Sequence, residues 1–333
     1  MKTKTACALL GVLAFCTVQN AVGAELPTLR YGGDDGLPHL PLIIAEKEGF
    51  FTKEGIRVEI VKLPVGAAGT FEQGYISAIE RGGPSDMTEE NAGFFLDAVL
   101  HGSDAAAVGV QTANPVYSLI VQPEIKTYAD LKGKKVTLTA TWDAITLTAR
   151  ALLAKHGIGR NDFTFEAIRN SGPRLECMKQ GKCVAIAAVQ PTDTQAVNLG
   201  LGFHSFGTTY EAGPVTFYMD IVRREWAKTH QDTIVRYLRA EADAIRFIND
   251  PKNRGEVAKA IADITHVPPD LVNQLVTAYA DPKLRILSPH GEFDMASFNN
   301  LLRFAKDSGN YDKPLPPAEK FVDLSYVKAA GIQ

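Results

Sequence analysis

Short apolar segments of strand length alternate with segments of helical length along most of the chain. Strand-like residues 29–32, 57–61 and 105–110 are separated by helical patterns at residues 38–48, 69–80 and 89–101. Such alternation is typical of α/β layers built around a largely parallel sheet. The first third of the chain is therefore predicted to form one α/β unit.

A second cycle of the same kind occupies the middle of the chain. Its predicted strands are 116–121, 135–139, 163–168, 184–189 and 202–206, and its predicted helices are 144–156, 173–180 and 195–199. A strand at 215–222 then leads into predicted helices at 233–249, 254–265, 269–279 and 295–308. A chain of 333 residues exceeds what one hydrophobic core usually serves, so two lobes are expected.

The C-terminal helices can return to the first unit if the middle of the chain is an inserted lobe. We predict lobe 1 at residues 25–113 plus 214–333 and lobe 2 at residues 114–213. The two crossings then fall near residues 113–115 and 212–214, where Pro and Gly occur. These residues suit segments that absorb dihedral change during closure of two lobes. They also suit ordinary loops, and the sequence leaves both interpretations open.

The N-terminus has the pattern of a secretory signal peptide. Lys2 and Lys4 precede an apolar run at residues 6–18, and small residues lead to a predicted cut after Ala24. No later run approaches the roughly 20 apolar residues of a membrane helix. Cys16 follows the bulky Phe15 where a lipoprotein signal needs a small residue, so lipidation is not expected. The mature protein is predicted to be soluble and periplasmic.

Two cysteines, Cys177 and Cys183, remain after the predicted cut. In an oxidising compartment they can bridge the end of a helix to the next strand across a Gly turn. Two unpaired, partly buried thiols are the alternative, because disulfide geometry is strict. No cluster of Cys and His with ligand spacing accompanies them, so no metal site is predicted. A formal net charge of -3 gives no reason to expect nucleic acid.

Five segments resemble one family of transport proteins. Residues 40–56 (LPLIIAEKEGFFTKEGI) resemble the opening of ABC solute-binding proteins of the nitrate/sulfonate/taurine and thiamine-precursor type. Later segments of this family are similar to residues 128–136 (YADLKGKKV), 177–186 (CMKQGKCVAI), 267–270 (VPPD) and 321–326 (FVDLSY). One departure is the extra Gly83-Pro84 within residues 78–87, where the family passes directly from helix to strand.

This resemblance implies a two-lobed Venus-flytrap fold of the second periplasmic-binding-protein type, with two interlobe crossovers. It implies a ligand held between the lobes, and a membrane permease with a cytoplasmic ATPase as partners. No cofactor is implied, and we expect a monomer. Residues 78–87 adjoin a ligand loop, so the departure there leaves the shape of that loop open.

In open α/β sheets, ligands lie beyond the carboxyl ends of the strands. The loop after the first strand contains Asp34 and Asp35, which can accept hydrogen bonds, and His39, which can donate one. Either aspartate can instead cap the turn or the following helix. Gly66 and Ala67 lie in a small-residue loop before a predicted helix, whose free N–H groups would suit an anion.

Further candidates follow the later strands. Thr88 is either a ligand contact or a helix N-cap. In lobe 2, Thr141 and Asp143 suit an N-cap as well as a ligand contact, and Trp142 either walls the ligand or packs on its lobe. After the next strands come Arg169 and Asn170, and then Gln190. Arg169 would grip a carboxylate or sulfonate, unless it is an ordinary surface arginine.

These candidates favour an organic acid with an apolar body, although the acidic pair at Asp34 and Asp35 argues for a donor-rich portion. No catalytic residue is predicted, because the chain contains no nucleophile elbow, zinc-binding histidine pair or phosphate-binding loop. An enzyme on a related fold is one alternative to transport. A binding protein that signals to a receptor is another.

Overall fold

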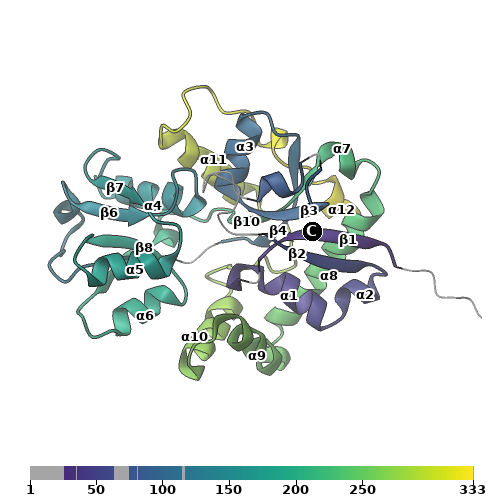
Figure 1. The fold of residues 1–333 in the computed structure, drawn as a ribbon, viewed down its shortest axis with the longest axis horizontal. Helices are drawn as coiled ribbons and strands as arrows, with labels where there is room; N and C mark the ends of the chain where they lie inside the picture. Colours follow the sequence, from purple (N-terminus) through teal and green to yellow (C-terminus); the bar gives the residue numbers. More distant parts are fainter. Residues whose placement is uncertain (1–25, 35, 64–74, 81, 115–116, 333) are drawn as a thin grey trace, which may run out of the picture.

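Two five-stranded sheets form the centres of two lobes in the structure, a computed structural model (Figure 1). It describes residues 26–34, 36–63, 75–80, 82–114 and 117–332. The predicted signal peptide and Cys16 lie outside this range. No helix in these residues is long and apolar enough to span a bilayer.

The first sheet has the strand order β2-β1-β3-β10-β4. Its strands are β1 (Thr28–Gly33), β2 (Arg57–Lys62), β3 (Met87–Asn91), β4 (Ala105–Thr112) and β10 (Tyr218–Arg223). Consecutive residues of a strand face opposite sides of a sheet, so Ile221 and Val222 enter two different hydrophobic clusters. Lobe 1 is therefore a sheet covered on both faces.

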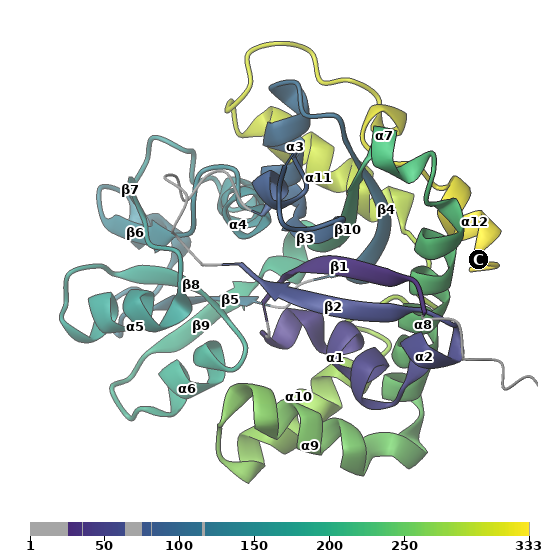
Figure 2. The same ribbon diagram turned by 45° about the vertical axis from the view of Figure 1, so that its right-hand side comes forward.

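Helices from both ends of the chain cover this sheet. They are α1 (Leu40–Lys47), α2 (Phe50–Lys53), α3 (Ala92–Leu100), α7 (Arg224–Ala227), α8 (Gln231–Asn249), α9 (Arg254–Thr265), α10 (Pro269–Ala280), α11 (Met295–Asp307) and α12 (Ser325–Ala329). The C-terminal helices thus return to lobe 1, where α8 packs on α1 (Figure 2).

The second sheet repeats this plan with the order β7-β6-β8-β5-β9. Its elements are β5 (Tyr117–Val121), β6 (Lys135–Leu138), α4 (Ala144–Lys155), β7 (Thr164–Ala167), α5 (Ser171–Lys179), β8 (Ala185–Val189), α6 (Thr192–Asn198) and β9 (His204–Thr208). In each sheet the strand fourth in order, β10 or β5, is antiparallel to both neighbours. Each is also the first strand that the chain enters after crossing from the other lobe.

The predicted α/β class with two crossovers is confirmed. The crossings lie side by side, because the Val215 N–H donates to Asn114 Oδ1 at 3.4 Å. Gly213 has a φ of 117°, which only glycine adopts readily. The boundaries at residues 113 and 214 remain a prediction.

One predicted helix begins too early, and a second is only partly within the described residues. Residues 89–91 belong to β3, which ends at Asn91, and the helix starts only at Ala92. Glu89 and Glu90 are fully buried in this strand because His39 and backbone N–H groups satisfy their carboxylates, so their charge disguised a buried strand. In the predicted helix at 69–80, residues 69–74 lie outside the described residues and Ile76–Ala78 forms one short 3-10 turn.

Cys177 and Cys183 lie together at the end of α5 and the start of the next strand. Their Cα atoms are 5.7 Å apart, which suits a disulfide, and both side chains are buried. A bridge over so short a loop would stabilise the fold by about 2 kcal/mol on the chain-entropy model. The bond itself remains a prediction.

The two lobes meet where α3 of lobe 1 and α4 of lobe 2 begin. A Cβ atom on Gly93 would overlap the carbonyl oxygen of Trp142, so only glycine permits this approach. One hydrophobic cluster continues across the contact, with Phe95 on one side and Leu147 on the other. We call this contact between α3, α4 and α11, which packs on both, the seam.

We predict that Gly93→Ala destabilises the protein by about 1–3 kcal/mol in urea unfolding, because the added methyl group forces the seam apart. Gly255→Ala is the matched control. It lies within α9 with open space around it, so alanine should raise stability by about 0.5–1 kcal/mol. A Gly93→Ala protein as stable as the control would show that the lobes do not approach here.

Candidate ligand site between the lobes

A cavity of about 360 Å³ lies between the two lobes, beside the seam. Lobe 1 lines it with Asp34, Leu37, Pro38, Phe94, Thr112, Phe217, Tyr218, Tyr279 and Ile286. Lobe 2 lines it with Thr139, Asp143, Ile145, Arg169, Asn170, Ser171, Arg174, Val189 and Gln190. The volume fits a small organic molecule, and both lobes would contact it at once.

Two helix N-termini meet at the floor of this cavity. Asn91 caps α3, and its Oδ1 accepts from Gly93 N–H and from Ala144 N–H of the other lobe, both at 3.0 Å. The Asn91 amide donates to Asp143 Oδ1 at 3.1 Å, and Asp143 caps α4 through Ile145 N–H at 2.8 Å. Each helix is therefore capped by a residue that also binds the other lobe.

The lobe 2 wall is organised by a buried arginine. Arg174 donates to the carbonyls of Ile168, Arg169 and Ala187 and to Ser171 Oγ. These bonds tie the carboxyl ends of β7 and β8 together, and burial lowers the pKa of Arg174 to about 10. Arg174 thereby holds the loop that carries Arg169 and the start of α5 against the cavity.

The lobe 1 wall is mainly aromatic. Phe94 comes from α3, Phe217 directly precedes β10, and Tyr218 begins that strand. The ring centroids of Phe217 and Tyr218 are 4.6 Å apart. Tyr279 closes one end and donates through its hydroxyl to the carbonyl of Leu37 at 3.0 Å. This wall offers an apolar surface to the body of a ligand.

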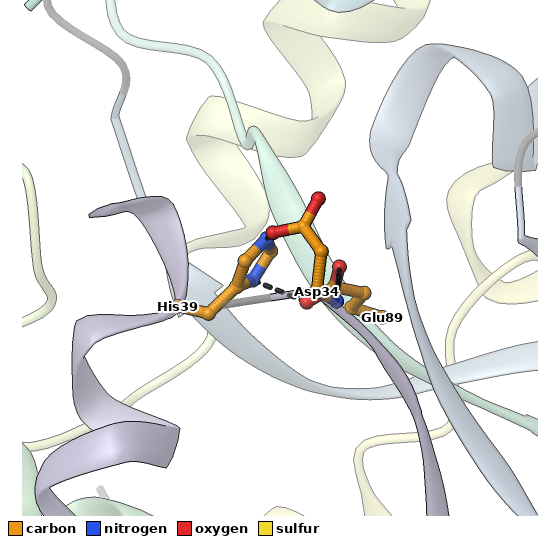
Figure 3. A group of neighbouring side chains, drawn as sticks. All are labelled: Asp34, His39 and Glu89. Carbon is orange, nitrogen blue, oxygen red and sulfur yellow. Dashed lines mark hydrogen bonds and ion pairs between the residues drawn. The ribbon is translucent and has the colours of Figure 1, made fainter. Parts of the chain in front are cut away.

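Behind the aromatic wall, His39 lies between two carboxylates (Figure 3). Its Nδ1 contacts Glu89 Oε2 and lies 2.9 Å from Gln111 Oε1, and its Nε2 lies 3.3 Å from Asp34 Oδ1. His39 and Glu89 are fully buried, whereas Asp34 reaches the cavity. The imidazole therefore joins a wall residue to the buried interior of lobe 1.

These contacts fix the charges of the group. Burial alone would lower the pKa of His39, but Glu89 and Asp34 outweigh it and raise the pKa to about 10. Burial raises the pKa of Glu89 to about 7, although His39 opposes the shift. Burial also opposes ionisation of Asp34, yet His39, Gly36 N–H and Tyr75 hold its pKa well below the usual range. Asp34 therefore presents a negative charge to the cavity.

Asp34, His39 and Glu89 are also residue types that bind divalent ions, and their donor atoms lie within 4.8 Å of one another. However, the two nitrogens of His39 face different carboxylates, and a single ion can bind only one nitrogen of a ring. The arrangement suits an imidazolium that donates a proton on each side. The grouping was not predicted, because Glu89 lies 50 residues after His39 in the sequence.

Five of the predicted ligand residues line the cavity: Asp34, Asp143, Arg169, Asn170 and Gln190. Asp143 also caps a helix, so the two roles that the sequence left open are combined in one residue. Asp35, Gly66 and Ala67 lie outside the described residues. That these residues contact a ligand remains a prediction.

Four predicted residues do not line the cavity. Trp142 is buried in the hydrophobic cluster at the seam, because the start of α3 lies against its loop. Thr88 is buried within β3 and donates to the Gly32 carbonyl at 2.9 Å. His39 is enclosed by its carboxylates, and Thr141 turns its carbonyl toward Asn310. For Trp142, the structure shows the packing alternative.

The sequence analysis did not predict the aromatic residues that line the cavity from lobe 1, which are Phe94, Phe217, Tyr218 and Tyr279. Phe217 precedes β10 and Tyr218 begins it, but this strand runs antiparallel, so its start lies at the same edge as the ends of the others. The aromatic Phe217-Tyr218 pair beside the Gly213-Pro214 crossing was the available signal.

Comparison with protein families matches residues 37–253, more than half of the chain, to a model described as NMT1/THI5-like. The chain belongs to the NMT1/THI5-like family. This match confirms the resemblance seen in the sequence. Comparison with curated proteins finds no match.

Solved structures share the fold of this NMT1/THI5-like chain. The alkanesulfonate-binding protein SsuA from Xanthomonas axonopodis pv. citri, bound to MOPS, has a TM-score of 0.67 and 18% identity over 92% of this chain and 98% of its own. The nitrate-binding protein NrtA from Synechocystis PCC 6803 has a TM-score of 0.70 and 16% identity over 92% and 89%. The desulfurization enzyme DSZB has a TM-score of 0.63 and 13% identity over 91% and 98%.

We predict that His39→Gln lowers the free energy of unfolding at pH 7 by about 1–3 kcal/mol, because Asp34 loses its cation and the buried Glu89, whose pKa is already about 7, loses its charged partner. The folded-state pKa of His39, about 10, lies above its usual 6.5. Its stabilisation is therefore full below about pH 6.5 and is lost as the pH rises through 10.

Urea unfolding from pH 6 to pH 10.5 measures how the stabilisation by His39 depends on pH, with His101→Gln at an exposed position as the control. The difference between wild type and His39→Gln should shrink toward high pH. Equal stability of wild type and His39→Gln at pH 7 would contradict the charge assigned to His39.

Proposed function

We propose that the protein is an extracytoplasmic solute-binding protein that captures a small organic anion between its lobes and delivers it to an ABC importer. One observation carries the proposal: a cavity is lined by both lobes, with Arg169 and the start of α5 on one side and an aromatic wall on the other. A ligand held by both lobes stabilises their closed arrangement, which a permease can recognise.

The polar groups of the cavity suggest the parts of the ligand. Arg169 and the N-terminus of α5, which has no side-chain cap, would receive a carboxylate or sulfonate. Asp34 would accept from a hydroxyl, amide or amine, and Phe94, Phe217 and Ile286 would cover an apolar body. Both polar features of the ligand predicted from sequence thus have a counterpart in the cavity.

Similar structures support transport, since SsuA is described as alkanesulfonate-binding and NrtA as nitrate-binding. DSZB shows that the fold also supports enzymes. The described residues that line the cavity include no cysteine or histidine. The hydroxyls of Thr112 and Thr139 are engaged with Pro38 O and Thr146, and Ser171 Oγ accepts from Arg174 and from Val189 N–H. This favours binding over nucleophilic catalysis. The proposal also includes export of the protein by the predicted signal peptide. Its partners would be a membrane permease and the ATPase of that permease.

A thermal-shift screen of the mature protein against organic acids, sulfonates, nitrate, amines and pyrimidines tests the function. We expect one class of organic anion to raise Tm in a saturable manner. Arg169→Ala should weaken binding of that ligand about tenfold or more in calorimetry, because a charge-assisted hydrogen bond is lost.

Arg254→Ala is the matched control, since this exposed arginine lies at the start of α9, away from the cavity. Equal affinity of both variants would remove Arg169 from the site. If no compound shifts Tm in folded, ligand-free protein, the transport proposal fails.

A further inference from the structure

A second cavity, of about 420 Å³, lies behind the seam and shares no lining residue with the ligand cavity. Its walls come from α4 and the loop after it in lobe 2, and from α11. We call it the basic pocket, because the described residues that line it include Arg150, Lys155, Arg160 and Arg303. Asp307 is the one carboxylate among them.

The positive charge of the basic pocket is poorly compensated. Asp307 lies 4.0 Å from Arg303 Nη1, the limit of an ion pair, and both side chains are more than half exposed. Within the described part of the chain, no carboxylate pairs with Arg150, Lys155 or Arg160. Arg160 donates to Ser308 O and Lys155 to Glu211 O, both at 2.8 Å, and these carbonyls are neutral.

Arg150 is the least satisfied of these cations. Its Nε is buried without a hydrogen-bond partner, and its Nη1 reaches Asn310 Oδ1 only at 3.5 Å. Its guanidinium carbon lies 4.8 Å from the centre of the Phe165 ring, and the side chain lines the pocket. Burial lowers the pKa of Arg150, and the positive charge of Arg160 lowers it further. Two neighbouring guanidinium groups, one half-buried at Arg150 and one exposed at Arg160, repel each other less when an anion lies between them.

We propose that the basic pocket is a second binding site, which takes a multiply charged oxyanion of the phosphate or sulfate class. Guanidinium groups match the geometry of such oxyanions, and several donors of Arg150 and Arg160 remain available for them. The bound anion would join α4 of lobe 2 to α11, which packs on α3 of lobe 1. The site would therefore reinforce the seam from the side opposite the ligand cavity.

Titration of inorganic phosphate into the purified mature protein at constant ionic strength tests the site by calorimetry. We expect one saturable event for wild type and at least about tenfold weaker binding for Arg160→Gln, which loses a charged donor. Arg303→Gln, at the exposed rim, should weaken binding less and is a second variant if Arg160→Gln folds poorly. Arg254→Gln, outside both cavities, should bind phosphate as wild type does.

Absence of saturable binding to wild type would overturn the proposal, and so would equal affinity of wild type, Arg160→Gln and Arg303→Gln. Binding that survives in Arg160→Gln but disappears in Arg169→Ala would place the anion in the ligand cavity instead. Phosphate binding with no response to any organic solute would leave the basic pocket standing while the transport proposal fails.

Discussion

The contact between Asn91 and Asp143 sets the relation of the two lobes. Each residue caps the helix of its own lobe, and each also bonds to the other lobe. Gly93 lets the helices approach, and a continuous hydrophobic cluster seals the contact. Because separating this seam would expose apolar surface and break buried hydrogen bonds, the lobes are expected to move by pivoting about it.

The ligand cavity follows from the seam. Two sheets with equivalent strand orders lie on either side of the cavity, and residues at the carboxyl ends of β1, β6, β7 and β8 line it. Buried charges then hold the walls in place: His39 positions Asp34, and Arg174 positions the loop of Arg169. The residues that face the cavity are thus supported by buried ionic groups, of which His39 lies outside the cavity lining and Arg174 forms part of it. On the opposite side of α4, the basic pocket presents charge that the protein itself does not neutralise.

Much of this architecture could be predicted from the sequence. Alternation of strands and helices predicted the fold, and the rule that ligands lie beyond strand ends found Asp34, Arg169 and Gln190. The rule failed for Phe217 and Tyr218, because the direction of β10 depends on pairing with strands distant in sequence. It also misplaced Trp142, since exposure of a loop depends on which helix packs over it.

The buried group of His39 and Glu89 was beyond local pattern for a related reason. A carboxylate within a strand indicates exposure unless its partner is known, and here the partner lies 50 residues earlier. Helix prediction at residues 89–91 failed for this reason. Long-range pairing of charges is therefore the part of the structure that the sequence conceals most.

A double-mutant cycle between Asn91 and Asp143 tests the seam most directly. The free energies of unfolding of Asn91→Ala, Asp143→Ala and the double variant are compared with that of wild type by urea denaturation. If residues of opposite lobes bond as described, the two substitutions should show a coupling energy of about 0.5–3 kcal/mol. Strictly additive effects would mean that the two residues do not interact, and would contradict the account of how the lobes are joined.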